Sequence, residues 1–288
     1  MTKALAVLLG FVGGIHIAAI DLAGRSAIPR VGIVALVFLG IGLGLLATAL
    51  VRKRLPDRSP GGVEYYVVTG VGGLAGPILV LVHAIPNMPT GALAPVLALS
   101  VTAATAWPEI RRGQAAGYML AAAALVAAAL LVAAAQREEL NWLLAAIAAS
   151  LVAGGVHQAT RGMRPVGEGL IQSATGGVLA AAVVTTLFYM AQGDVIDFSA
   201  DWQAGGSLVP EMVAFGLVEI GLCTILLRRS PIGAWAPIAA VAPVAGLVWM
   251  ALVGDLRADP MIWGAALVLT AAVVLHFSGL PGRVARGR

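Results

Sequence analysis

Glu219 is the residue of this chain whose type and position most directly suggest chemistry. It lies near the middle of a long apolar stretch, residues 209–227, where an ionised carboxylate costs about 2.5 to 3.5 kcal/mol on membrane-insertion scales. Carboxylates at such depths usually face a bundle interior or a wet cavity, where they bind protons or cations. The alternative is a protonated Glu219 that joins two helices by hydrogen bonds.

Two histidines occupy matching places in the chain. His16 and His157 lie within apolar stretches, and each follows a Gly-Gly pair by two residues. Imidazole exchanges protons near neutral pH and donates hydrogen bonds to polar ligands. We expect the two rings to approach one another if the two halves of the chain face each other. The alternative is that each histidine satisfies a hydrogen bond within its own half.

Three further polar side chains, those of His83, Gln158 and Gln172, lie within or near apolar stretches and are secondary candidates for substrate or proton binding. Side chains of this kind are more often structural. No nucleotide-binding, zinc-binding or serine-nucleophile motif occurs in the sequence, so we expect no cofactor, no metal and no enzymatic activity. The single Cys223 excludes an intrachain disulfide.

The composition places these residues in a membrane. Of the 288 residues, 60% are hydrophobic and 11% are charged, whereas soluble domains are about 45–50% apolar and about 25% charged. This composition excludes an ordinary soluble enzyme and a nucleic-acid-binding protein. We expect the lipid bilayer to be the surrounding partner.

Ten stretches are long and apolar enough to span a bilayer, which takes about 20 residues. They are 4–23, 31–51, 65–86, 90–108, 115–135, 141–160, 169–190, 209–227, 232–253 and 260–279. None has the polar and apolar alternation of a membrane β-strand, so the sequence predicts an all-α integral membrane protein. Residues 1–23 also fit a cleaved signal peptide, but their removal would leave nine spans.

The basic residues test this count. With ten spans, four of the 18 Lys and Arg residues fall on one side, namely Arg25, Arg30, Arg137 and Arg257. The other fourteen fall on the side of both termini. The positive-inside rule therefore predicts cytoplasmic termini and a multi-pass protein of the bacterial inner (plasma) membrane.

An internal repeat divides the chain into two halves. The segment 12–18 (VGGIHIA) returns as 153–159 (AGGVHQA), and 89–95 (PTGALAP) returns as 231–237 (PIGAWAP), at offsets of 141 and 142 residues. We therefore expect two domains, residues 1–138 and 139–288. Because five spans are an odd number, the second copy must enter the membrane from the opposite face, which gives two inverted repeats.

Several sequence features of this repeat also occur in a known family. They are the Gly-Gly pairs of the first and sixth spans, the basic clusters after the second and eighth spans, and the patterns Pro95, Glu109, Gly117 and Pro243, Asp255, Gly264. On these marks the chain resembles the EamA type of the drug/metabolite transporter superfamily. The resemblance implies ten helices in two five-helix repeats and transport of small metabolites. The chain differs from the family by Asp255 in place of the usual Glu.

The repeat and the resemblance together predict a secondary transporter. We expect an exporter of a small polar or amphipathic metabolite that works by alternating access, with proton coupling through Glu219 as a further hypothesis. One alternative is a flippase for lipids or lipid-linked carriers. The others are a non-transporting membrane scaffold and an intramembrane enzyme built on Glu219 and the two histidines.

Overall fold

The structure is a computed structural model and describes residues 2–25, 29–193, 196, 208–229, 236–253 and 257–278. The described part of the chain is helical and contains no strand. In chain order its helices are α1 (Thr2–Gly24), α2 (Arg30–Val51), α3 (Pro60–Val67), η1 (Val68–Ala75), α4 (Gly76–Ala84), η2 (Ile85–Asn87), α5 (Leu93–Arg111), α6 (Ala115–Ala134), α7 (Leu140–Ala159), η3 (Thr160–Gly162), α8 (Leu170–Gln192), α9 (Leu208–Arg229), α10 (Ala236–Val253) and α11 (Pro260–Ser278).

Within the described residues, seven helical segments are long and apolar enough to cross a membrane. The continuous segment Pro60–Asn87, which joins α3, η1, α4 and η2, counts as one of them. Two shorter apolar helices, Val241–Val253 and Pro260–His276, follow near the end of the chain. These helices confirm the expected all-α class and indicate a membrane-embedded protein.

Two helix starts, whose preceding residues are also described, differ from the expected ones by three residues or more, and each has a local cause. The third expected stretch begins at residue 65, but α3 begins at Pro60, because the Ser59 side chain caps it and accepts a hydrogen bond from the Gly62 N–H. The fourth expected stretch begins at residue 90, but α5 begins at Leu93. Gly91 has a φ of 83°, which no regular helix accommodates.

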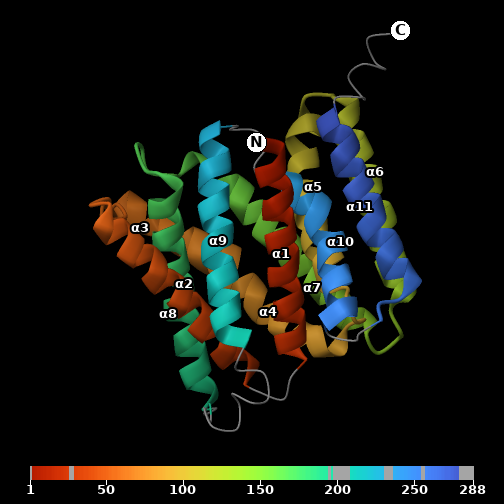
Figure 1. Cartoon of the computed structure of the whole chain (residues 1–288), viewed down its shortest axis with the longest axis horizontal. Helices are drawn as coiled ribbons and strands as arrows, with labels where there is room; N and C mark the ends of the chain where they lie inside the picture. Colours follow the sequence, from red (N-terminus) through yellow and green to blue (C-terminus); the bar gives the residue numbers. More distant parts are fainter. Residues whose placement is uncertain are drawn as a thin grey trace.

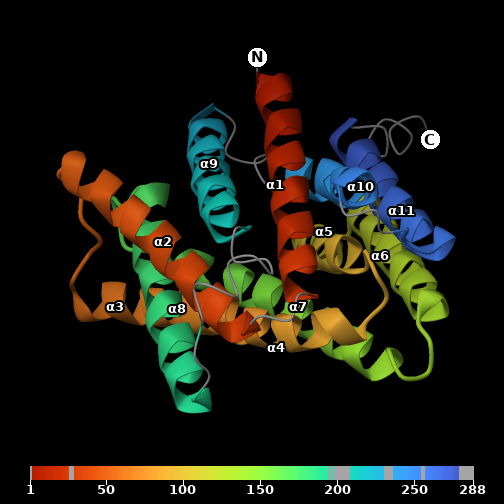
Figure 2. The ribbon, with the colours of Figure 1, turned by 60° about the horizontal axis from the view of Figure 1, so that its bottom comes forward.

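The helices pack in two groups on either side of α1 (Figures 1 and 2). Figure 2 shows α2, α3, α8 and α9 on one side of α1 and α5, α6, α10 and α11 on the other. One hydrophobic cluster joins α1, α2, α8 and α9, and a larger one joins α4, α5, α6, α7, α10 and α11. Consecutive long helices alternate in direction, so α1 begins and α11 ends at the same end of the bundle (Figure 1). We call this the N-terminal end.

The backbones of α1 and α10 cross closely in the centre of the bundle. A Cβ on Gly14 would lie 2.8 Å from the Ala242 carbonyl oxygen and 2.9 Å from the Gly246 nitrogen. Only glycine permits the two backbones to approach this closely, which is how small residues drive helix association in a membrane.

A π-helical segment, η1, interrupts the third spanning segment just before Pro77. Proline has no N–H, and its ring collides with the carbonyl four residues earlier in an α-helix. The wider π turn relieves this collision. At the same segment Gly70 meets α8, since a Cβ there would lie 2.3 Å from the Gly177 carbonyl oxygen. One face of the irregular turn therefore packs against α8.

Candidate functional site

A cavity of about 430 Å³ lies in the middle of the bundle. Residues of α1, α2, η1, α4, α5, α7 and α9 line it, and most of them are apolar. Its polar lining residues are His16, Arg30, Ser100 and Glu219. Largely apolar lining with a few convergent polar groups is typical of small-molecule sites.

The His16 and Glu219 side chains meet at this cavity. The His16 Nδ1 lies 3.0 Å from the Glu219 Oε2, and the two side chains are 14% and 24% exposed. The pair joins α1 to α9 across 203 residues of sequence. The sequence identified both residues, and the structure brings them together.

The surroundings of the imidazole indicate where its proton lies. The His16 Nε2 is buried and has no hydrogen-bond partner in the described part of the chain. A buried N–H without an acceptor is rarer and less favourable than an unfilled acceptor. The arrangement therefore favours an Nδ1–H that donates to the Glu219 Oε2, which leaves the second carboxylate oxygen for a ligand.

The cavity extends from the middle of the helices toward the end opposite the N-terminal end. At that end it is lined by Gly24, Arg30, Val82 and Met212. The Arg30 Nε donates a 2.6 Å hydrogen bond to the Gly24 carbonyl oxygen and so bridges the ends of α1 and α2. The Arg30 cation therefore lies at the outer end of the cavity, and the Glu219 carboxylate lies at mid-depth of the bundle.

The N-terminal end is tied by a hydrogen-bond network around Glu168. The Glu168 Oε1 accepts hydrogen bonds from the Tyr66 hydroxyl and from the Asp57 N–H, the latter at 2.8 Å, and its Oε2 accepts one from the Ser173 hydroxyl at 3.0 Å. Nearby, the Gln172 Nε2 donates to the Leu55 carbonyl oxygen. These bonds connect the α2–α3 loop and α3 with α8 and the loop before it.

Asp57, in the α2–α3 loop, has a solvent-accessible carboxylate. The Ser59 hydroxyl and the Ser59 N–H both donate to it, at 2.6 and 3.0 Å. These hydrogen bonds hold the pKa of Asp57 below its usual range, because they favour the ionised form.

The two histidines that the sequence pairs have different surroundings in the structure. His157 lies in the exposed last turn of α7 and does not line the cavity. His16 meets Glu219 instead, because the face of α1 that carries His16 packs against α9. The cavity thus contains one imidazole and one carboxylate, and His157 lies apart from both.

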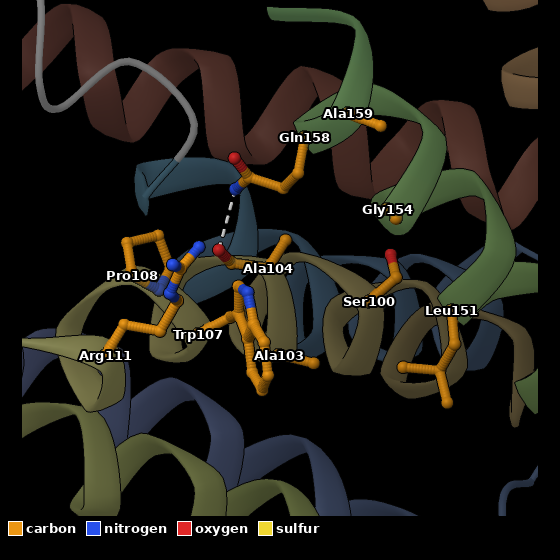
Figure 3. A pocket seen from close by; sticks show the side chains of 11 residues that line it. Ser100, Ala103, Ala104, Trp107, Pro108, Arg111, Leu151, Gly154, Gln158 and Ala159 are labelled. Atoms are coloured by element: carbon orange, nitrogen blue, oxygen red, sulfur yellow. Dashed lines mark hydrogen bonds between the residues drawn. The ribbon is translucent and has the colours of Figure 1, made fainter.

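The secondary candidates have structural hydrogen bonds. His83 is exposed, and its Nδ1 lies 2.7 Å from the Leu79 carbonyl oxygen one turn earlier. Gln172 accepts a hydrogen bond from the Gly169 N–H at the start of α8. Gln158 donates to the Ala104 carbonyl oxygen at 2.7 Å, across a second hollow between α5 and α7 (Figure 3).

Sequence reasoning missed two polar residues of the cavity, Arg30 and Ser100. Arg30 entered the sequence argument only as a charge, although its place at the start of a span was a usable signal. Ser100 lies in an apolar stretch that also contains Thr102 and Thr105, and it donates to the Leu97 carbonyl oxygen. Asp255, part of the family pattern, lies outside the described residues.

No cluster of three or more His, Cys, Asp or Glu side chains suited to a metal ion occurs among the described residues. Asp21 is buried and forms an ion pair with Arg25, whose Nε lies 2.8 Å from the Asp21 Oδ1. The Arg25 guanidinium also donates to the Met88 and Pro89 carbonyl oxygens. This pair ties the end of α1 to the connection before α5 and is structural.

Comparison with known proteins gives information on the fold but not on the function. No family model matches the chain, and no curated protein matches it. A solved structure described as "Crystal structure of protein" is similar, with a TM-score of 0.63, 23% sequence identity, and coverage of 97% of this chain and 98% of that one. At this identity the likeness establishes the fold alone, over nearly the whole length of both chains.

Proposed function

We propose that this protein is a secondary active transporter, an exporter of a small polar or amphipathic metabolite, that works by alternating access. The observation that carries the proposal is the His16–Glu219 pair, which lies at mid-depth of the bundle and lines a mostly apolar cavity of about 430 Å³. A titratable pair at the centre of a membrane bundle is a typical ion or substrate site. A non-transporting scaffold needs no such cavity.

The helix packing supports two inverted repeats of five spans, residues 1–138 and 139–288. The repeat makes α1 equivalent to α7, α2 to α8, the α3–α4 segment to α9, α5 to α10 and α6 to α11. The equivalent helices of three pairs contact each other directly, as expected around a two-fold axis: α2 with α8, α5 with α10, and α6 with α11. The α1–α10 contact also has its counterpart in α7–α5, and α1–α9 in α7–α4.

Two equivalent glycines support alternating access. Gly14 is pressed against α10, but a Cβ on its counterpart Gly155 would meet no atom within 4 Å. The α1–α10 crossing is therefore closed at Gly14, whereas the α5–α7 crossing is packed at Gly154 and leaves space at Gly155. We expect the alternate state to exchange the two, with α7 closing on α5 while α1 separates from α10.

The two ends of the bundle also differ from each other, as expected for a transporter that is open toward one side. The cavity reaches toward the Arg30 end, whereas the Glu168 network ties the N-terminal end. With both termini in the cytoplasm of a bacterial inner membrane, as the basic residues predict, the described state is closed to the cytoplasm. We expect the Glu168 network, which joins the α2–α3 loop to α8, to loosen when the N-terminal end opens.

Proton coupling follows from the pair at the cavity. Glu219 releases its proton when a substrate cation or hydrogen-bond donor occupies the carboxylate, and takes it back when the substrate leaves. His16 holds the carboxylate in one orientation through the Nδ1 contact.

Glu219→Gln in proteoliposomes tests the proposal. The variant should lose accumulation driven by a pH gradient but keep counterflow exchange, because the amide cannot release a proton. Glu211→Gln is the matched control, since Glu211 is exposed in the first turn of the same helix. Undiminished gradient-driven transport by Glu219→Gln contradicts the coupling role. Absence of any exchange by the wild type, over a panel of amino acids, sugars and amphipathic cations, contradicts small-metabolite transport.

A lipid flippase is the second candidate, and the hollow between α5 and α7 favours it. Ser100 lines both this hollow and the central cavity, so the two spaces adjoin. A lipid headgroup moving between them would pass Ser100. Transfer of fluorescent lipid across vesicles that contain the wild type, absent in empty vesicles, would establish this function in place of metabolite transport.

A further inference from the structure

The hollow between α5 and α7 is a groove of about 590 Å³. Its middle is lined by small residues of both helices, namely Ala103, Ala104, Gly154, Gly155 and Ala159. Because a Cβ on Gly155 would meet nothing within 4 Å, α7 leaves open space beside α5 at this point. Figure 3 shows Leu151 and Ser100 toward one end of the groove and Trp107 and Arg111 toward the other.

The rims of the groove face outward. Trp107 is 61% exposed and Leu151 is 44% exposed, and both α5 and α7 are of membrane-spanning length. In a bilayer these exposed apolar side chains contact lipid. The small apolar residues between them therefore favour an acyl chain over water.

The Arg111 end of the groove is positively charged. Arg111 lies in the last turn of α5, is exposed, and has no ion-pair partner in the described part of the chain. The nearest acid on the same helix, Glu109, packs against Gly117 of α6, since a Cβ on Gly117 would lie 2.7 Å from the Glu109 Cβ. Glu109 therefore occupies a different side of α5.

Trp107, one turn before Arg111, marks the depth of this end. Tryptophan is enriched at membrane–water interfaces, where its ring lies at the level of the headgroups. A guanidinium at that depth forms charge-assisted hydrogen bonds with phosphate oxygens. Basic pockets between spanning helices bind anionic lipid headgroups in this way.

We propose that the groove binds one anionic phospholipid. Its phosphate lies against Arg111, and an acyl chain lies along the small residues beside Gly155. The binding site lies on the outer surface of the bundle and does not depend on metabolite transport, although the flippase candidate uses the same groove.

Native mass spectrometry of the full chain tests the headgroup. The protein is released from nanodiscs that contain equal amounts of phosphatidylglycerol and phosphatidylcholine. The wild type should retain phosphatidylglycerol in preference, by about fivefold for one cation near the surface. Arg111→Gln should abolish the preference, whereas Arg112→Gln should not, because Arg112 is an exposed arginine on the same helix end that does not line the groove. Equal retention of both lipids by the wild type, or an equal loss in the two variants, overturns the proposal.

A second pair of variants tests the place of the acyl chain. Gly155→Phe fills the groove and should remove the retained lipid of either headgroup. Gly162→Phe is the matched control, since a Cβ on Gly162 also meets nothing within 4 Å but the residue lies outside the groove. Retention of lipid by Gly155→Phe at the wild-type level shows that the lipid binds elsewhere. Thermal unfolding of both variants confirms that they are folded.

Discussion

Gln158 of α7 donates a hydrogen bond to the Ala104 carbonyl oxygen of α5. This carbonyl lacks its usual helical N–H donor, because the residue four positions later is Pro108. Pro108 lies inside α5 and has no N–H for the carbonyl four residues earlier. The Gln158 Nε2 lies 2.7 Å from the Ala104 oxygen and replaces that donor. A side chain of one helix thus repairs the backbone of another within the membrane.

Gln158→Leu should destabilise the protein by about 1 kcal/mol, because the Ala104 carbonyl then has no donor. In a Pro108→Ala background the same change should cost less, since the alanine backbone supplies the missing N–H. Unfolding in mixed micelles measures all four proteins of this cycle. An equal loss in the two backgrounds would show that Gln158 acts independently of Pro108.

Gly14→Ala should destabilise the protein by about 2 kcal/mol through overpacking, because the new methyl group collides with the α10 backbone. Gly155→Ala, at the equivalent position of the second repeat, should have no destabilising effect, because the methyl group enters open space. Thermal unfolding of the two variants measures the difference. Similar losses at both sites would mean that α7 packs on α5 as closely as α1 packs on α10.

Glu168→Gln should loosen the N-terminal end of the bundle, because the amide accepts hydrogen bonds from Tyr66, Asp57 and Ser173 less strongly than a carboxylate. Hydrogen–deuterium exchange should increase in residues 55–66 and remain unchanged in α10 and α11. Tyr66→Phe should give a smaller increase, since it removes one bond of the network. Glu138→Gln, in the α6–α7 connection at the opposite end, is the control and should change neither region.

Ser59→Ala should reduce stability at neutral pH, because it removes both the cap of α3 and a donor to Asp57. The Asp57 part has a defined pH dependence. Since its folded pKa is lowered, its contribution is complete above the ordinary value of about 4 and is lost as the pH falls through the folded pKa. The melting-temperature difference between wild type and Ser59→Ala should therefore shrink in acid. In an Asp57→Asn background the difference should be independent of pH, and a constant difference in the wild-type background would argue against the Asp57 part.

The sequence by itself determined the class of the fold and the depth of the important side chains. Apolar stretches of about 20 residues give helices of spanning length, because backbone polar groups in lipid must bond within their own segment. Glu219 and His16 could be placed near the middle of such stretches by counting residues from their ends. His16 and Glu219 could be identified as cavity residues from the sequence because their depth in the membrane alone indicated a functional position.

Only the tertiary structure decided which faces of the helices meet. A helix that is apolar all round has no polar face to indicate its orientation, so position along the chain gives depth but not direction. His16 and His157 are equivalent by sequence, yet His16 meets Glu219 and His157 is exposed. In the same way Gly14 is packed and Gly155 is free. Residues that are equivalent in sequence have different surroundings here, because the hydrogen-bond network lies at one end of the bundle and the cavity reaches toward the other.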